Sequence, residues 1–302
     1  MVEFERFLDG GGIVEVDDDM PSEYRKAVFR FIELHANSEL MGGLTERDWI
    51  PKTPGLRHKM AVLAKTQDEI GHAHLLYMVA ADMAVKSRGE MLEDLFAGKS
   101  KFHNVFHYQA LTWGDQVAIA FLVDAAALAS QQAVFKNCSY GPYRRILKRI
   151  ISEEGFHMRL GEDRMMRIAE GTDVQRNLFQ DSLDRWFWPA LQLFGPDSRP
   201  DDKLLRWHIK SERNEDLRHK WVQKFVPLIQ SYGFTIPAPD LHQDADGQWQ
   251  VGPIDWEPLK ATMAQGGPDS ARRIAEARHH WEQTAWVRDA LAQVAMARDA
   301  AA

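Results

Sequence analysis

Apolar residues recur every three or four positions through much of the first 232 residues, a spacing typical of amphipathic helices. The pattern predicts helices over about 21–43, 55–87, 143–170, 173–193 and 202–232, and a nearly all-apolar helix over 113–135. We expect the first helix to begin at Pro21 and to end at Gly42–Gly43, because proline favours a helix start and glycine a helix end. The chain is therefore predicted to be all-α, with the apolar 113–135 helix enclosed by the others.

The C-terminal part of the chain differs in character. Pro237–Trp256 is rich in Pro, Asp and Gly, and Asp246–Gly247 is typical of a hairpin turn. A polar helix is expected from about 268 to 298. We therefore predict one helical domain over 1–236 and a C-terminal extension over 237–302, a loop or hairpin followed by a helix, which packs on this domain or bridges to partner subunits.

Composition narrows the class of protein. The chain is 45% hydrophobic and 27% charged, which is enough for a large core. A net charge of −7 without a long basic run argues against nucleic acid as a partner. We find no segment that approaches the roughly 18–20 apolar residues of a membrane helix and no apolar signal at the N-terminus, so we expect a cytoplasmic protein without a membrane partner. The single cysteine, Cys138, excludes a multi-cysteine metal site and is expected to be buried.

Two Glu-x-x-His units carry the candidate chemistry. Glu69 and His72 lie three residues apart in one predicted helix, as do Glu154 and His157 in another, so each pair shares a helix face. With 12 histidines in 302 residues such a match also arises by chance, and a third begins at Glu276. The first two therefore need support from their surroundings.

That support comes from two further acids. Glu39 precedes Glu69, and Asp124 precedes Glu154, by the same 30 residues, which looks like an internal duplication. Asp246 has the same offset from Glu276, but it lies in a turn-like segment, and arginines around Glu276 indicate a solvated surface. We therefore predict that the third match is structural.

The surroundings of the first two units indicate burial. Apolar residues continue the helix faces of both units, and Asp124 is the only charged residue between 117 and 129. A lone carboxylate there would cost several kcal/mol in desolvation unless it is neutralised. Four carboxylates balance two divalent cations, as in ferritin-like di-iron or di-manganese bundles with the site in a four-helix core, and ligand type alone does not decide between iron and manganese. The expected metal ligands are Glu39, Glu69, His72, Asp124, Glu154 and His157.

Several longer stretches resemble one protein family. These are HANSELMGGLTERDWIPKTPGLRHKMAVLAKTQDEIGHAHLLY, LVDAAALASQQAVF, SYGPYRRILKRIISEEGFHMRLGE, RWFWPALQLFGP and IPAPDLH. They closely resemble the catalytic subunits of the phenylacetyl-CoA epoxidases, also called ring 1,2-phenylacetyl-CoA monooxygenases, over about Pro21–Arg288. The resemblance implies a ferritin-like di-iron fold with extra helices, and it places the family's catalytic metal ligands on the six residues named above.

The resemblance also implies a reaction and its partners. A carboxylate-bridged centre of two Fe ions would activate O2, one oxygen atom entering the ring of phenylacetyl-CoA to give the 1,2-epoxide in phenylacetate catabolism and the other leaving as water. Electrons would come from NADPH through a flavin and an iron–sulfur cluster on a separate reductase subunit. The implied complex further contains a structurally related, non-catalytic helical subunit and a small additional subunit.

Four other residues are weaker candidates. Lys65 lies one turn before Glu69 on the inward face, where a lysine needs an anionic partner. That partner is a metal ligand, a cofactor phosphate or the acyl-CoA, so Lys65 is a candidate for substrate binding, with a structural ion pair as the alternative. Arg30 is a weaker candidate for contact with CoA phosphate. Asp68 and Glu153 directly precede ligand glutamates, and we expect each to orient a histidine on a neighbouring helix, with an ordinary surface acid as the alternative.

Other functions would use the same ligands. The alternatives are a di-iron oxygenase of another aromatic acyl-CoA, a ferritin-type iron oxidase or store, a manganese or mixed-metal radical subunit, and a non-catalytic paralogue. The length and the 237–256 segment argue against a ferritin, and the complete ligand set argues against a paralogue without metal.

Overall fold

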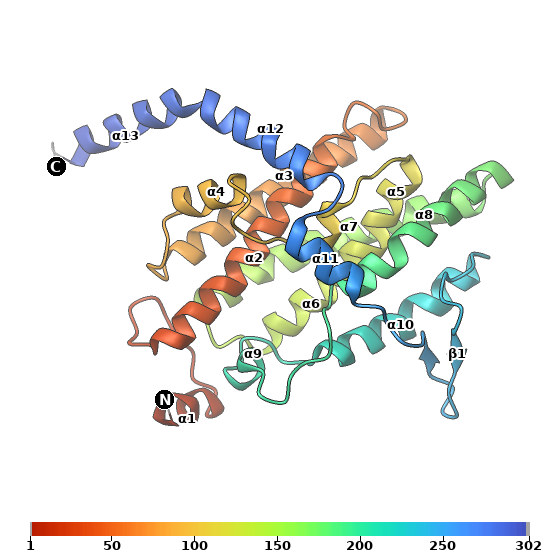
Figure 1. Ribbon diagram of the computed structural model, residues 1–302, viewed down its shortest axis with the longest axis horizontal. Helices are drawn as coiled ribbons and strands as arrows, with labels where there is room; N and C mark the ends of the chain where they lie inside the picture. The colour runs from red at the N-terminus through yellow and green to blue at the C-terminus, as the bar shows by residue number, and fades with distance from the viewer. Residues whose placement is uncertain (1, 300–302) are drawn as a thin grey trace.

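The computed structural model describes residues 2–299, which are almost entirely helical (Figure 1). The long helices are α2 (Ser22–Arg47), α3 (Leu56–Ala81), α6 (Asp124–Asn137), α7 (Gly141–Ala169), α8 (Asp173–Gln192) and α10 (Asn214–Ser231). Shorter elements are α1 (Val2–Asp9), α4 (Arg88–Phe96), the 3-10 turn η1 (Asn104–His107), α5 (Trp113–Ala118), the π-helical η2 (Ile119–Val123) and α9 (Lys203–Arg206). The C-terminal part contains β1 (His242–Gln243), β2 (Trp249–Gln250), α11 (Glu257–Gln265), α12 (Ser270–Gln283) and α13 (Ala285–Asp299). The predicted all-α class is confirmed.

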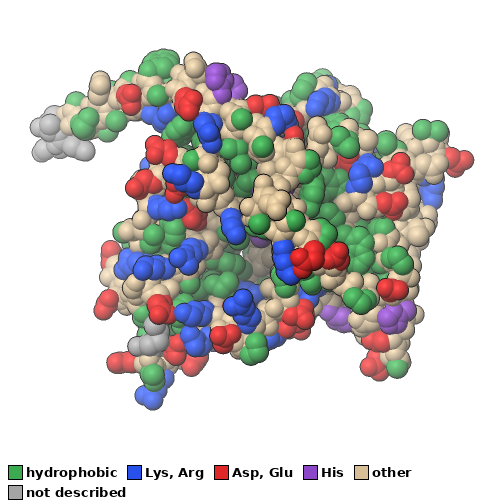
Figure 2. All heavy atoms as spheres, viewed as in Figure 1, with side chains coloured by type: hydrophobic (Ala, Val, Ile, Leu, Met, Phe, Trp, Pro, Cys, Tyr) green, Lys and Arg blue, Asp and Glu red, His purple; other side chains and the backbone are tan. Residues whose placement is uncertain are grey.

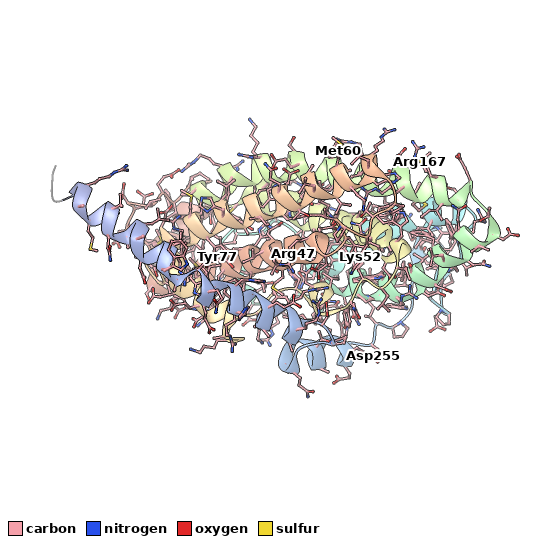
Figure 3. All side chains as sticks on the ribbon, turned by 90° about the horizontal axis from the view of Figure 1, so that it is seen from above. Arg47, Lys52, Met60, Tyr77, Arg167 and Asp255 are labelled. Carbon is pink, nitrogen blue, oxygen red and sulfur yellow. The ribbon has the colours of Figure 1, made fainter. Side chains whose placement is uncertain are left out.

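Four helices form the centre of the molecule as two pairs, α2 with α3 and α6 with α7. The η2 segment packs on α7, and α8 and α10 cover the α5–α6 side. Figure 3 shows Met60 of α3 and Arg167 of α7 along one edge and Asp255 of the C-terminal segment at the opposite edge, with the helices packed between them. This arrangement directs the inner faces of the four central helices toward one another.

The Gly42–Gly43 pair does not end α2, contrary to the sequence prediction. The helix continues to Arg47 because both glycines serve close packing. A Cβ atom on Gly42 would lie 3.1 Å from the Phe106 ring, and one on Gly43 would lie 3.0 Å from Ile70 of α3. The two glycines therefore let α2 approach its neighbours closely, one turn beyond Glu39.

Several predicted boundaries were also wrong. The 55–87 helix ends at Ala81, and Ser87 caps the separate helix α4 through a capping box with Glu90. The 202–232 helix is interrupted between α9 and α10, and the final helix is broken at Thr284. Helices α1, α4 and α11 were not predicted, because short helices give too few repeats to stand out from the surrounding polar sequence.

The apolar 113–135 segment is the enclosed helix that the pattern predicted, although η2 interrupts it. The expectation that no segment resembles a membrane helix was wrong, since residues 113–137 are long and apolar enough to qualify. However, 78% of the most apolar window is buried inside the protein. Its composition is that of a core helix surrounded by other helices.

The C-terminal segment packs on the helical body before it leaves it. The predicted hairpin forms between β1 and β2, with Gly247 in the left-handed region, and Trp249 exchanges backbone hydrogen bonds with the Gln223 side chain of α10. Helix α11 contacts η1, and α12 contacts α4. Figure 1 shows α13 projecting away from the rest of the chain. The segment from residue 237 is thus anchored at three places.

Candidate metal centre

The structure brings all six expected ligands together in the interior. The donor atoms form two overlapping groups. Within each group the atoms lie within 4.8 Å of one another, and they come from different helices. The first contains Glu39 of α2, Glu69 and His72 of α3, and Glu154 of α7. The second contains Asp124 of α6 with Glu154 and His157 of α7. All six side chains are buried, so this group of carboxylates and imidazoles could hold metal ions.

The outer ring nitrogen, Nε2, of each histidine contacts a carboxylate that is not part of the cluster. His72 Nε2 lies 2.7 Å from Glu153 of α7, and His157 Nε2 lies 3.0 Å from Asp68 of α3. Each acid therefore contacts the histidine of the other Glu-x-x-His helix, as the sequence predicted. The inner nitrogen, Nδ1, of each histidine is buried and has no hydrogen-bond partner. An outward N–H bonded to a carboxylate with an unprotonated inner nitrogen is the state in which imidazole binds a metal, so these residues fit metal ions.

Glu69 and Glu154 lie between the two histidines. One oxygen of Glu154 is 3.3 Å from His72 Nδ1, and the other is 3.6 Å from His157 Nδ1. Glu69 has the same arrangement, with distances of 3.9 Å to His72 and 3.6 Å to His157. Each carboxylate thus directs one oxygen toward each histidine, and of the two only Glu154 belongs to both groups of donor atoms.

Glu39 presents a single oxygen to the cluster. Its Oε1 lies 2.7 Å from His35 Nε2 and accepts a hydrogen bond of 3.3 Å from Gln131, whereas Oε2 lies 3.5 Å from His72 Nδ1. His35 is in turn 2.8 Å from the Tyr143 hydroxyl. These contacts hold the pKa of Glu39 well below its usual range, although burial acts in the opposite direction. Glu39 therefore directs one carboxylate oxygen, Oε2, toward the cluster.

Lys65 lies on the opposite side of the cluster. Its Nζ is 2.6 Å from Asp124, 2.9 Å from Glu46 and 3.7 Å from Glu69. Burial would lower the pKa of Lys65, but these three carboxylates raise it well above its usual value. The buried lysine thus has its anionic partners within the protein, in these three carboxylates.

A second layer of polar groups supports Lys65. Gln116 donates a hydrogen bond to Glu46, and Arg164 donates one of 3.0 Å to Gln116. All three side chains are buried. Sequence reasoning missed Glu46, Gln116 and Arg164, although Glu46 follows Glu39 by two helical turns on the same face.

The four buried carboxylates of the cluster lie close together and need neutralising charge. Burial and the nearby Glu154 and Glu39 raise the pKa of Glu69 well above its usual value, and burial raises the pKa of Asp124 to about 6 despite Lys65. Burial disfavours protonation of His72, but the nearby carboxylates of Glu154 and Glu39 raise its pKa to about 11. Protons and Lys65 thus neutralise the metal-free site, and divalent ions would take their place with release of protons.

A local change of helix type precedes Asp124. In η2 the helix is π-helical, and the Asp124 N–H donates to Ile119 O, five residues earlier. Gly161 of α7 lies against the Ala120 backbone at this point, where a Cβ would clash. Single π-turns inside α-helices are frequent at functional sites because they shift the following side chains around the axis. Apart from the apolar run, nothing along the chain signals this feature.

A cavity of about 160 Å³ adjoins the cluster. Its lining is mainly apolar and includes Phe31, Leu34, Phe106 and Val123, and it reaches the chain between α8 and α10. Figure 2 shows a hollow near the middle of the displayed face, in the region of α2, α6 and α11, with Lys and Arg side chains around it. The four carboxylates of the two donor groups line this cavity, and the two histidines do not.

Three other sequence candidates lie elsewhere. Arg30 is exposed on α2 and is not among the residues that line the cavity. Glu276 is partly exposed on α12 in an ion pair with Arg272, and Asp246 lies in the β1–β2 turn. The third Glu-x-x-His match is therefore a surface feature, as predicted. Cys138 is buried, and burial raises the pKa of its thiol to about 12.

Comparison with known proteins agrees with this geometry. Residues 3–286 match the family described as "Phenylacetic acid catabolic protein". A relative from Escherichia coli (strain K12), named as one of the subunits of "1,2-phenylacetyl-CoA epoxidase", is 38% identical over 291 residues, which cover 95% of this chain and 94% of the relative. The similarity therefore includes the helical body and most of the C-terminal segment.

Proposed function

The chain belongs to the phenylacetic acid catabolic protein family, and from this membership and the ligand geometry we propose that it is the catalytic di-iron subunit of a phenylacetyl-CoA 1,2-epoxidase. The proposal rests chiefly on one observation: two buried, unpartnered histidine nitrogens face four buried carboxylates beside an apolar cavity.

The ligand assignment follows from the contacts. Glu39, Glu69 and His72 would hold one iron ion, Asp124 and His157 would hold the other, and Glu154 would contact both. Bound iron would supply the activation of O2 that aromatic epoxidation requires. Asp68 and Glu153 hold the outer nitrogens of the histidines, which fixes the tautomer that leaves Nδ1 free.

The cavity suits the aromatic ring of the proposed substrate. A cavity of about 150 Å³ lined by apolar side chains is large enough for benzene, so the 160 Å³ cavity fits one phenyl ring. The apolar lining would exclude water from the ring and direct it toward the carboxylate cluster. The thioester arm would leave the ring along the part of the lining between α8 and α10, which includes Lys210, and the rest of CoA would lie outside the cavity.

The partners follow the name of the relative, which is one subunit of an epoxidase. We expect a related non-catalytic helical subunit, a small additional subunit, and a reductase that carries electrons from NADPH through flavin and an iron–sulfur cluster. The described residues contain one buried cysteine, so this chain offers no such cluster site of its own. Helix α13, with exposed Trp286, Leu291 and Met296, is the part of the 237–302 extension that we expect to bridge to a partner, in the cytoplasm.

The proposal is tested by metal loading followed by turnover. After anaerobic loading with ferrous ion, the purified chain should hold about two irons. With its partner subunits, reductase and NADPH under O2, it should convert phenylacetyl-CoA to a product that contains one atom of labelled oxygen. Free phenylacetate serves as the control substrate and should not react.

Each rival predicts a different result. A ferritin-type store would accumulate many irons per chain and would consume O2 without a thioester. An oxygenase for another aromatic acyl-CoA would prefer that compound in direct competition. A chain that binds no iron under these conditions would overturn the proposal.

A further inference from the structure

The loop between α9 and α10 is fixed to the C-terminal half of α6. Ser211 donates two hydrogen bonds to the Ala133 carbonyl oxygen, from its N–H at 3.2 Å and from its hydroxyl at 2.6 Å. The Ser139 N–H donates to His208 O at 2.9 Å. His208 itself has a positive φ of 53°, a conformation that non-glycine residues rarely adopt and that persists only where the surroundings impose it.

This fixed loop places Lys210 in the wall of the cavity beside the metal centre. Lys210 is only 8% exposed, and it lines the same cavity as Glu39 and Asp124. Among the lining residues the other lysine is Lys65, which is bound to three carboxylates. Lys210 is therefore the cation that remains for an occupant of the cavity.

The contacts of Lys210 leave part of its donor capacity unused. Its Nζ donates to Asn214 Oδ1 at 2.6 Å and lies 3.5 Å from Asp202. Asn214, which also lines the cavity, is held in turn by its side-chain donation to Pro196 O at 2.8 Å. An ammonium group has three N–H donors, so one donor remains for a ligand oxygen. Burial lowers the pKa of Lys210, which reflects incomplete solvation of the charge.

The distance from Asp124 to the loop that carries Lys210 is similar to the length of the acyl arm of a CoA thioester. Its neighbour Ser211 is bonded to Ala133, nine residues after Asp124, which corresponds to about 13 Å along α6 at 1.5 Å per residue. An extended chain advances about 1.2 Å per bond, since three backbone bonds span about 3.5 Å. In a phenylacetyl thioester of CoA, the first amide carbonyl lies eight bonds beyond the reacting ring carbon, or about 10 Å. With the ring carbon a few ångströms from the metal ligands, this amide reaches the Lys210 end of the cavity.

We propose that Lys210, positioned by Asn214, donates a hydrogen bond to the amide carbonyl of the pantetheine arm nearest the thioester. This inference rests on the proposed function, because it assigns a part of the same substrate. The contact would set the depth to which the arm enters and hence the placement of the ring relative to the carboxylate cluster. A purely structural lysine, paired with Asp202, is the competing explanation.

Binding to the iron-loaded full-length chain, without reductase or NADPH, separates these explanations because no turnover occurs. Isothermal titration would compare three ligands: phenylacetyl-CoA, the phenylacetyl thioester of N-acetylcysteamine, which keeps the amide, and the phenylacetyl S-pentyl thioester, which lacks it. Lys210→Met should weaken the first two by the same factor, about tenfold, as expected for one charge-assisted hydrogen bond. It should leave the third unchanged, and Lys210→Arg should recover most of the loss.

The control variant is Lys220→Met, which removes an exposed lysine of α10 that pairs with Glu212. It should bind all three ligands as the wild type does. Equal weakening of all three ligands by Lys210→Met, or of none, would overturn the assignment, as would weakening of phenylacetyl-CoA alone, which would indicate contact with phosphate. Wild-type protein that binds iron but no phenylacetyl thioester would instead refute the proposed substrate, and the contact with it.

Discussion

The two halves of the candidate metal centre have the same pattern of carboxylates and histidine but different supporting residues. In the half built on α2 and α3, Glu39 lies on an uninterrupted helix. The imidazole of His35 and the amide of Gln131 contact its carboxylate. In the half built on α6 and α7, Asp124 follows a π-helical turn, and the ammonium of Lys65 lies 2.6 Å from it. A repeated sequence pattern has therefore produced two sites that differ in electrostatics.

The difference has a physical cause in side-chain length and charge. Aspartate is one methylene shorter than glutamate, and the extra residue of the π-turn changes the direction in which the Asp124 side chain leaves α6. Lys65 stabilises the carboxylates of this half by charge, whereas Glu39 is oriented by hydrogen bonds that leave one oxygen free. In the first half the carboxylate of Glu39 is thus already oriented toward the cluster without a metal ion. In the second half the charge of the Asp124 carboxylate is already balanced by Lys65.

The largest expected effect comes from removing the residue that both halves share. Glu154→Gln should abolish binding of both irons, because Glu154 belongs to both groups of donor atoms. Glu39→Gln and Asp124→Asn should each retain up to one iron of the expected two, since each removes a terminal ligand. Elemental analysis after anaerobic loading measures this directly.

Glu276→Gln is the matched control, since it alters the third Glu-x-x-His match on the surface of α12. This variant should hold as much iron as the wild type. Retention of both irons by Glu154→Gln would show that the two halves do not share a bridging carboxylate.

The helix crossings of the two halves should differ in their tolerance of an added methyl group. Gly161→Ala would press its Cβ on the Ala120 backbone of η2, which cannot turn aside, so we expect a loss of about 3 kcal/mol in unfolding free energy. Gly43→Ala meets the partly exposed Ile70 side chain at 3.0 Å, which can rotate, so a loss of about 1 kcal/mol is expected. Denaturant unfolding of the metal-free protein gives both values.

Gly155→Ala on α7 is the control for these substitutions. Its nearest neighbour is the Arg159 side chain at 3.7 Å, so the variant should be as stable as the wild type or more stable by about 0.5–1 kcal/mol. Equal losses for Gly161→Ala and Gly43→Ala would contradict a rigid contact at the π-turn.

Removal of the supporting group tests the electrostatic difference. Lys65→Met leaves Asp124 and Glu46 buried without their cation, and the metal-free protein should lose about 3–5 kcal/mol. His35→Gln removes one hydrogen-bond partner from Glu39, which keeps Gln131, so a loss of about 1–2 kcal/mol is expected. Thermal unfolding with and without ferrous ion measures both variants, and the metal should restore more stability to Lys65→Met. If the two variants were equally stable, the electrostatic asymmetry between the halves would be refuted.

A graded effect on metal affinity is expected from the acids that contact the outer nitrogens of the histidines. Asp68→Asn should weaken the metal bound by His157, and Glu153→Gln the metal bound by His72, each by about 10–100-fold. Titration against a chelator of known affinity resolves the two sites. Asp163→Asn, on the exposed side of α7 in a pair with Arg167, is the control and should leave both affinities unchanged.

Much of the site could be predicted from sequence because its pattern is local. The three-residue spacing of Glu69 with His72 and of Glu154 with His157 places each pair on one face of any helix that forms. The lone charge at Asp124 within an apolar segment indicates burial with a cation, whatever the fold. Asp68 and Glu153 could also be named, because the residue before an inward ligand lies at the edge of the helix interface.

The tertiary structure decided how these helix faces meet. Glycine normally ends helices, and only the approach of α3 and Phe106 explains why α2 continues through Gly42 and Gly43. The ladder from Lys65 through Glu46 to Gln116 joins three helices, so no single stretch of sequence contains it. The interruption between α9 and α10, which brings Lys210 to the cavity, depends on hydrogen bonds to the distant Ala133. The sequence by itself determined the long helices and the candidate ligands, because periodicity and spacing are properties of one segment; the positions of the supporting charges were decided by contacts between segments.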